Sequence, residues 1–184
     1  MKKMYSILLV VLINFNAFSQ GQETLFNGIN SSGGYGGPMI MVGGLANDVA
    51  VYSGGFGGWF INQNLTIGGG GASLISENQY DQSFGGFHLA YTLNSERLVH
   101  PHFTLFVGGG DIEQESEDGL NVLDDSYFML LPGIQGDLNV LSFMRVGIGI
   151  SYMQTYGVNL DQLSDNDLTG LMGTFSIKFG FFGH

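Results

Sequence analysis

The sequence contains no cysteine and only five lysine or arginine residues among 184. The absence of cysteine excludes disulfide bonds, a lipid-modified N-terminal cysteine and thiolate chemistry. The scarcity of basic residues argues against nucleic acid as a partner, because binding to phosphate backbones needs clustered lysine and arginine. The folded chain is therefore expected to be held together by packing and hydrogen bonds alone.

Residues 1–19 have the pattern of an export signal. Lys2 and Lys3 precede an apolar run, and small residues mark a cleavage site just before Gln20. The apolar run is short for a membrane-spanning helix, although a retained anchor is the alternative. Loss of both lysines with the signal changes the net charge from −11 to −13. The expected organisation is a signal peptide at 1–19, an N-terminal extension at 20–32 and a single β-barrel domain at 33–184.

Glycine is unusually placed in residues 33–71, where glycine pairs recur inside runs of isoleucine, valine and aromatic residues. Glycine within a strand lowers stability, so it usually marks a bend or the close approach of another group. A narrow closed sheet needs both, because it coils tightly and must hold aromatic side chains inside. The sequence therefore predicts a small closed β-barrel.

From Gly33 onward, eight apolar segments alternate with polar or turn-forming stretches. Each segment is about ten residues or longer, which a tilted strand needs to cross a bilayer, whereas strands of soluble proteins are usually shorter. We predict an all-β fold, an eight-stranded antiparallel up-and-down β-barrel of the outer-membrane type. The expected strands are residues 34–46, 49–61, 65–76, 83–93, 98–110, 126–137, 140–154 and 168–182.

Large apolar residues alternate with small or polar ones in the last two segments. An apolar outward face and a polar inward face are typical of a barrel surrounded by lipid. The residues expected to face outward are Met144, Val146, Ile148, Ile150, Tyr152, Leu171, Phe175, Ile177, Phe179 and Phe181. A soluble barrel or β-sandwich is the alternative, and there these residues would form an apolar patch that requires a partner.

The connections between the segments differ in length and in charge. The tight turns fall near residues 62–64, 94–97 and 137–139, and the longer connections are residues 77–82, 111–125 and 155–167. The longer connections contain many acidic residues and no lysine or arginine. Outer-membrane barrels have short periplasmic turns and longer outside loops. The outer end of the barrel should therefore be strongly acidic.

The fifth connection carries the densest acidic cluster, which we name the acidic outer loop. Its members are Asp111, Glu113, Glu115, Glu117, Asp118, Asp124 and Asp125. Carboxylates are hard oxygen ligands, but their spacing here is not that of a calcium-binding loop. A solvated loop is the preferred interpretation, with a charge that attracts divalent cations bridging to anionic surface glycolipids.

Motifs that carry a family resemblance are spread over most of the mature chain: GGYGGP at 33–38, GGFGGWFIN at 54–62, GGGG at 68–71, Pro132, Arg145 and KFGFF at 178–182. Together they resemble a family of small, secreted, glycine-rich bacterial β-barrel proteins. The resemblance implies a β-rich exported protein and no particular activity. The chain departs from the family pattern at four positions, so polar chemistry located there would be missing. They are Phe56 and Met153, where the family has arginine, Ala72, where it has tyrosine, and Leu131, where it has glutamate.

His88, His100 and His102 are expected to point into the lumen, because their neighbours in sequence face outward. A tight turn centred near Ser95 would place His88 opposite His102, close enough for the imidazoles to interact. Three neutral imidazoles suit zinc or another borderline transition metal. A proton-titrating cluster and simple polar filling of the lumen are the other interpretations, and polar filling is preferred. The choice depends on strand register.

Arg145 and Lys178 face inward on adjacent segments, and Asp137 ends the segment before that of Arg145. Charges inside a barrel need partners, so we expect an Asp137–Arg145 ion pair that closes the periplasmic end. A pore for anions is the alternative. Eight strands enclose little more than side chains, which favours the closed lumen.

The pattern as a whole favours a non-enzymatic outer-membrane protein of a Gram-negative bacterium, with a structural or surface-interaction role through its acidic outer loops. No cofactor is expected, and the expected partners are outer-membrane lipid and divalent cations at the acidic loops. One alternative is a soluble periplasmic or secreted barrel that binds a small ligand. Another is a lipid-modifying barrel enzyme with His88 or His102 as its base.

Overall fold

The computed structural model describes residues 32–46, 48–62, 64–77, 79–115, 122–160 and 163–182. The predicted signal peptide at 1–19 lies outside the described residues, as does the predicted extension at 20–32 except for its last residue. Within the described part of the chain, no helix has the length and apolar character needed to span a membrane.

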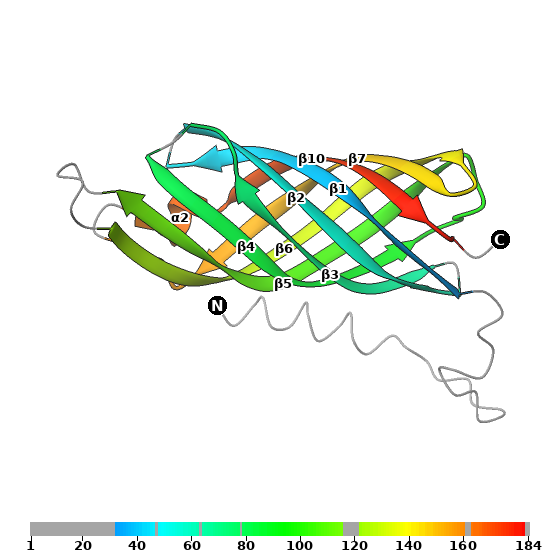
Figure 1. Cartoon of the computed structure of the whole chain (residues 1–184), viewed down its shortest axis with the longest axis horizontal. Helices are drawn as coiled ribbons and strands as arrows, with labels where there is room; N and C mark the ends of the chain where they lie inside the picture. Colours follow the sequence, from blue (N-terminus) through cyan, green and yellow to red (C-terminus); the bar gives the residue numbers. More distant parts are fainter. Residues whose placement is uncertain are drawn as a thin grey trace, which may run out of the picture.

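Eight strands close into an antiparallel β-barrel, which confirms the predicted fold class (Figure 1). Their order around the barrel is β1-β10-β7-β6-β5-β4-β3-β2. The strands are β1 (Ser32–Leu45), β2 (Asp48–Ile61), β3 (Leu65–Leu74), β4 (Tyr80–Thr92), β5 (Val99–Glu115), β6 (Val122–Leu141), β7 (Met144–Tyr156) and β10 (Gly170–Gly180). Between β7 and β10 lie the short elements β8 (Asn159–Leu160), β9 (Leu163–Ser164) and α2 (Asp165–Leu168).

The hairpin formed by β5 and β6 is longer than predicted. The sequence predicts a loop at residues 111–125, but the two strands remain paired as far as Glu115 and Val122. Buried and exposed side chains continue to alternate along β5 through the acidic residues, because Ile112 is fully buried between the exposed Asp111 and Glu113. In the described part of the chain, β6 pairs with β7 only from Phe128 onward. Residues 122–127 therefore project beyond the neighbouring strand, and we call this part of β5 and β6 the acidic hairpin.

Glycine lets neighbouring strands approach closely on the β2–β5 side of the wall. A Cβ at Gly86 would lie 2.6 Å from the Cα of Gly108, so this pair tolerates no side chain without movement. The interior beside these strands holds a column of rings whose successive centroids are 5.6–6.4 Å apart. Its members are Tyr52, Phe84, Phe106, His88, Phe56, Tyr35, Phe60 and Phe182. The glycine-rich wall and the aromatic interior are thus two parts of one packing arrangement.

A hydrogen-bonded brace crosses the barrel interior near its outer end. The hydroxyl of Tyr52 donates to Oε1 of Gln82 at 2.5 Å, and Nε2 of Gln82 donates to the hydroxyl of Tyr127 at 2.7 Å. The three residues lie on β2, β4 and β6, which are not neighbours in the barrel, and all are buried. The brace therefore joins strands that share no backbone hydrogen bonds.

Both ends of the barrel are covered by the chain itself. At the outer end, Leu163 and Leu168 of the connection between β7 and β10 are buried in the main core. The backbone N–H of Ala46 donates to the carbonyl of Asp167 at 3.0 Å, which ties this connection to β1. The Ser164 hydroxyl and backbone N–H both donate to the Asp167 carboxylate, which lowers the pKa of that carboxylate.

At the inner end, the side chain of Phe182 is 2% exposed and packs against Tyr35 and Phe60.

Candidate functional site

The outer surface of the barrel is apolar along the strands. Ile148 is 70% exposed, and Leu171 is 67% exposed. Trp59 and Tyr91 lie near the inner ends of β2 and β4, while Tyr156 ends β7 at the outer side. The outward faces predicted for the last two strands are confirmed, because their polar partners at the alternating positions are buried. An apolar band with aromatic residues at both ends is the surface expected of a barrel that faces lipid.

An ion pair lies inside the inner half of the lumen. Nζ of Lys178 donates to Oδ2 of Asp137 at 2.6 Å, and the two side chains are only 2% and 1% exposed. Nδ1 of His102 lies 3.8 Å from the same carboxylate oxygen. The second oxygen, Oδ1, has no hydrogen-bond partner among the described residues. Each of the two buried charges would be unfavourable alone, so each needs the other as its partner.

Arg145 does not take the place predicted for it. The predicted Asp137–Arg145 pair is replaced by the Lys178–Asp137 pair, and the guanidinium of Arg145 lies 3.9 Å from the ring centroid of Phe182. The reason is register, since Arg145 is opposite Asn139 on β6, whereas Gly147 is opposite Asp137. Arg145 therefore sits closer to the inner end, where it forms a cation–π contact with the C-terminal aromatic residue.

Gly147 is the position that allows the lumen ion pair to form. A Cβ at Gly147 would lie 2.6 Å from Oδ1 of Asp137, 2.7 Å from Oγ of Ser176 and 2.8 Å from Oε1 of Gln135. We expect Gly147→Ala to lower the free energy of unfolding by about 1–3 kcal/mol, because it overpacks a buried site. Urea titration in detergent, with the folded fraction read from gel mobility without heating, measures this loss.

The matched control for this change is Gly173→Ala on β10. Gly173 is exposed on the outside of the barrel, and the nearest atom to a Cβ there is the carbonyl oxygen of Val42 at 3.9 Å. We expect the control to change the free energy of unfolding by less than about 0.5 kcal/mol. Equal losses for the two variants would contradict the packing argument at Gly147.

The three histidines all point inward, but their predicted register is wrong. His88 pairs with Phe106, and His102 pairs with Thr92, so His88 and His102 are not opposite each other. Pairing of β4 with β5 begins only at Thr92 and His102, so residues 93–101 separate the two strands, and the partner of His88 moves four residues along β5, from His102 to Phe106. Nδ1 of His100 lies 3.1 Å from the carbonyl oxygen of Arg97. Among the described residues, no group of three or more histidine, aspartate or glutamate side chains is arranged to hold a metal ion.

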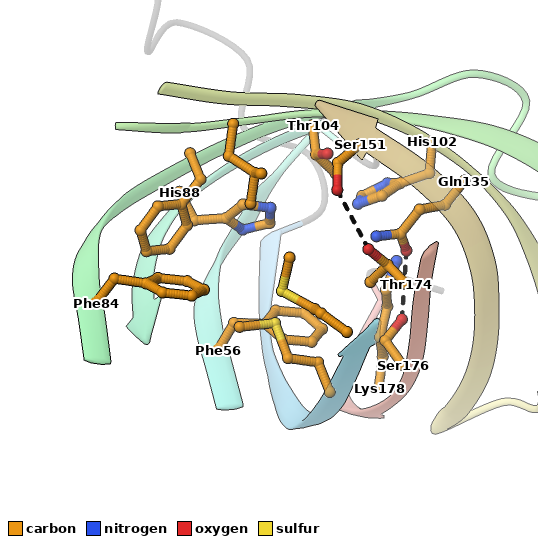
Figure 2. Close-up of a pocket in the computed structure, with 14 residues that line it drawn as sticks. Phe56, Phe84, His88, His102, Thr104, Gln135, Ser151, Thr174, Ser176 and Lys178 are labelled. Carbon is orange, nitrogen blue, oxygen red and sulfur yellow. Dashed lines mark hydrogen bonds between the residues drawn. The ribbon is translucent and has the colours of Figure 1, made fainter. Parts of the chain in front are cut away.

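A small internal space, which we call the lumen cavity, lies between His88 and His102 in the middle of the barrel (Figure 2). Its volume is about 40 Å³. One wall is aromatic, with Phe56, Phe84 and Phe106, and the facing wall is polar. The polar wall is formed by His102, Thr104, Gln135, Ser151, Thr174, Ser176 and Lys178. A single buried water needs about 10–15 Å³, so the cavity has room for a few waters or one small ion.

The inward serines near the cavity are engaged with other polar side chains. Oγ of Ser151 lies 3.4 Å from Oγ1 of Thr174, and Ser176 donates to Gln135 at 3.3 Å. In the described part of the chain, neither serine hydroxyl bonds to His88 or His102. The arrangement therefore lacks the nucleophile and base contact that a serine hydrolase needs.

The carboxylates of the acidic hairpin lie on adjacent strands at the same level. Glu113 pairs with Asp81 of β4 on one side and with Asp124 of β6 on the other. Asp111, predicted in the same cluster, accepts a hydrogen bond from Ser126, and these side chains are exposed. Asp125 accepts hydrogen bonds from the backbone N–H of Ser126 and of Asn159. Glu117, Asp118 and the side chain of Glu115 lie outside the described residues.

Two parts of the lumen were missed at the sequence level. Phe182 continues the alternation of Lys178 and Gly180 on the inward face, and this period alone was enough to place it inside. The Tyr52–Gln82–Tyr127 brace has no comparable signal, because it joins residues at separations of 30 and 45 in the chain.

Comparisons with known proteins find similar structures without similar sequences. No family model matches the chain, and no curated protein sequence matches it. The chain is similar to the N-terminal β-barrel domain of Pseudomonas aeruginosa OprF, with a TM-score of 0.59, 10% identity and coverage of 82% of this chain and 98% of that one. Neisserial surface protein A is similar with a TM-score of 0.55, 11% identity and coverage of 82% and 96%. The outer membrane protein OprG of Pseudomonas aeruginosa is similar with a TM-score of 0.54 and 11% identity, and the match covers 82% of this chain and 96% of OprG. The chain therefore has the fold of the eight-stranded outer-membrane barrels.

Proposed function

We propose that this chain is a non-enzymatic barrel of the outer membrane of a Gram-negative bacterium, exported by residues 1–19, that acts at the cell surface through its acidic hairpin. The observation that carries the proposal is the division of the surface into an apolar band along the strands and a projecting acidic end. Lipid is the environment that makes such a band favourable, and water is the environment that suits the carboxylates.

The covered lumen supports a role outside the barrel rather than inside it. Pockets for drug-sized ligands usually enclose about 300–1,000 Å³. The lumen cavity has about 40 Å³, and both barrel ends are covered by buried side chains of Leu163, Leu168 and Phe182. This geometry disfavours a soluble carrier of small organic ligands.

The acidic hairpin supports interaction with cations or cationic partners. The row formed by Asp81, Glu113 and Asp124 places like charges directly opposite one another, which is unfavourable without counterions. Outside the signal, the chain has only Arg97, Arg145 and Lys178 as basic side chains. Arg145 and Lys178 are buried in the lumen, and Arg97 lies in the connection between β4 and β5 at the other end of the barrel. The counterions must therefore come from outside the chain. Divalent cations that bridge to anionic surface lipids are the partners we propose.

Cysteine labelling in intact cells tests both the location and the orientation. The chain has no native cysteine, so Asp124→Cys and Asn139→Cys each introduce one thiol, at the outer and inner ends of β6. We expect a membrane-impermeant maleimide to label Asp124→Cys in intact cells and Asn139→Cys only after lysis. The protein should fractionate with the outer membrane and run at a heat-dependent mobility.

Three results would contradict the proposal. Recovery of the protein in the soluble fraction would remove the lipid-facing assignment. Labelling of Asn139→Cys in intact cells, with Asp124→Cys protected, would invert the orientation. Binding of divalent cations to the detergent-solubilised barrel that is unchanged by Glu113→Gln with Asp124→Asn would remove the acidic hairpin as the cation-binding surface.

A further inference from the structure

We propose that the lumen cavity binds one soft monovalent metal ion, Cu(I), through the thioether sulfurs of Met39 and Met41 and the imidazoles of His88 and His102. These four side chains come from β1, β4 and β5 and line the same cavity. The thioether is a soft ligand that suits Cu(I), and imidazole binds copper as well as other transition metals, so the two thioethers make Cu(I) the choice. This site is separate from the acidic hairpin and does not depend on the proposed surface role.

The two imidazoles present unused nitrogen atoms to the interior. Nδ1 of His88 and Nε2 of His102 are buried and have no hydrogen-bond partner among the described residues. The residues are 7% and 2% exposed, so water outside the barrel does not satisfy these atoms. A buried nitrogen without a partner is unfavourable, and a bound ion would relieve this. Figure 2 shows the rings of His88 and His102 on opposite sides of the cavity.

The other ring nitrogen of His102, Nδ1, has a hydrogen-bond partner, as the nitrogen away from the metal usually has in a metal-binding histidine. Nδ1 lies 2.8 Å from Oγ1 of Thr92, which fixes the ring orientation. When Nδ1 carries the proton and donates to Thr92, the lone pair of Nε2 is free to bind a metal. Histidine ligands usually have such a partner on the nitrogen away from the metal. Thr92 is thus a positioning residue for His102.

The composition of the cavity wall selects a soft monovalent ion over a divalent one. Among the described residues, no carboxylate lines the cavity, and Phe56, Phe84 and Phe106 make much of it apolar. A divalent ion would be poorly compensated here, because burial of charge in apolar surroundings is unfavourable without anionic ligands. The ammonium of Lys178 also lines the cavity, but its charge is balanced by Asp137 at 2.6 Å. Bound waters would also give the imidazole nitrogens hydrogen-bond partners, but they would make no use of the thioethers. The experiment below therefore distinguishes bound water from bound Cu(I).

The test measures Cu(I) and Ag(I) binding by the barrel purified in detergent, after refolding without oxygen in the presence of either ion. Ag(I) serves as a redox-stable probe of the same ligand chemistry. We expect one ion per barrel, with sulfur and nitrogen ligands in the X-ray absorption spectrum. Thr92→Val should weaken Cu(I) binding roughly 10–100-fold, as the loss of a partner to a ligating histidine does elsewhere. Met39→Leu with Met41→Leu should weaken it at least as much.

The matched control is Met129→Leu with Met172→Leu. These methionines are also buried in the lumen but do not line the cavity, so Cu(I) affinity should be unchanged. Leucine replaces methionine with similar volume, and the heat-dependent gel mobility confirms that each variant is folded. No bound ion in the unaltered barrel, or binding that survives loss of Met39 and Met41, would overturn the proposal. Equal competition by Zn(II) would overturn the choice of a soft ion.

Discussion

Asp137→Ala is expected to lower the free energy of unfolding by about 3–5 kcal/mol, the range found when one partner of a buried ion pair is removed. The ammonium of Lys178 would lose its carboxylate acceptor while remaining 2% exposed. Arg145 would remain as a second buried cation with no acid beside it. Urea titration in detergent micelles, with the folded fraction read from unheated gel mobility, measures the effect.

A double variant separates the ion pair from the packing around it. Asp137→Leu with Lys178→Met removes both charges, and replacing a buried pair by apolar side chains is often neutral. We expect the double variant to recover most of the stability lost in Asp137→Ala. A single-variant loss below about 1 kcal/mol, the value typical of an exposed ion pair, would contradict the buried pairing of Asp137 and Lys178.

Ile148→Arg is expected to lower the free energy of unfolding in lipid vesicles by about 2–4 kcal/mol, as an arginine does on the lipid face near the middle of a bilayer. Ile148 is 70% exposed near the middle of β7, so the change disturbs little inside the protein. On a water-exposed surface, the same substitution would change stability by less than about 0.5 kcal/mol. The measurement therefore distinguishes lipid from water as the neighbour of this strand.

Leu123→Arg provides the control for this change. Leu123 is 44% exposed on β6, beyond the point where β6 begins to pair with β7. Because this part of the acidic hairpin lies outside the apolar band, we expect no measurable loss of stability. A similar loss at both positions would show that arginine acts through the strand itself, and the lipid-facing assignment of Ile148 would be wrong.

The barrel and the faces of its last strands were predictable because they depend on local patterns. In β10, every second residue from Met172 to Lys178 is buried, and this period can be read directly from the sequence. The end of β5 was misassigned for the opposite reason. Acidic residues usually indicate a solvated loop, but here they occupy the exposed positions of a continuing strand, with Ile112 inside.

The lumen was harder to predict because its contacts depend on register between strands. Sequence separation alone does not distinguish Arg145 from Lys178 as the partner of Asp137. The choice follows from Gly147 lying opposite Asp137, which leaves room for the lysine to reach across. The predicted pairing of His88 and His102 failed for a similar reason, since the length of the connection between β4 and β5 sets the alignment of both strands.

The brace of Tyr52, Gln82 and Tyr127 also affects the shape of the barrel as a whole. A closed sheet can flatten toward an oval cross-section while its strands stay paired, because flattening changes mainly the angles between strands. The two hydrogen bonds span a chord of the barrel from β2 through β4 to β6, and an oval would stretch or compress that chord. The two hydrogen bonds therefore oppose flattening of the barrel at this level. The acidic hairpin continues directly from this level, because Gln82 pairs with Ile112 of β5.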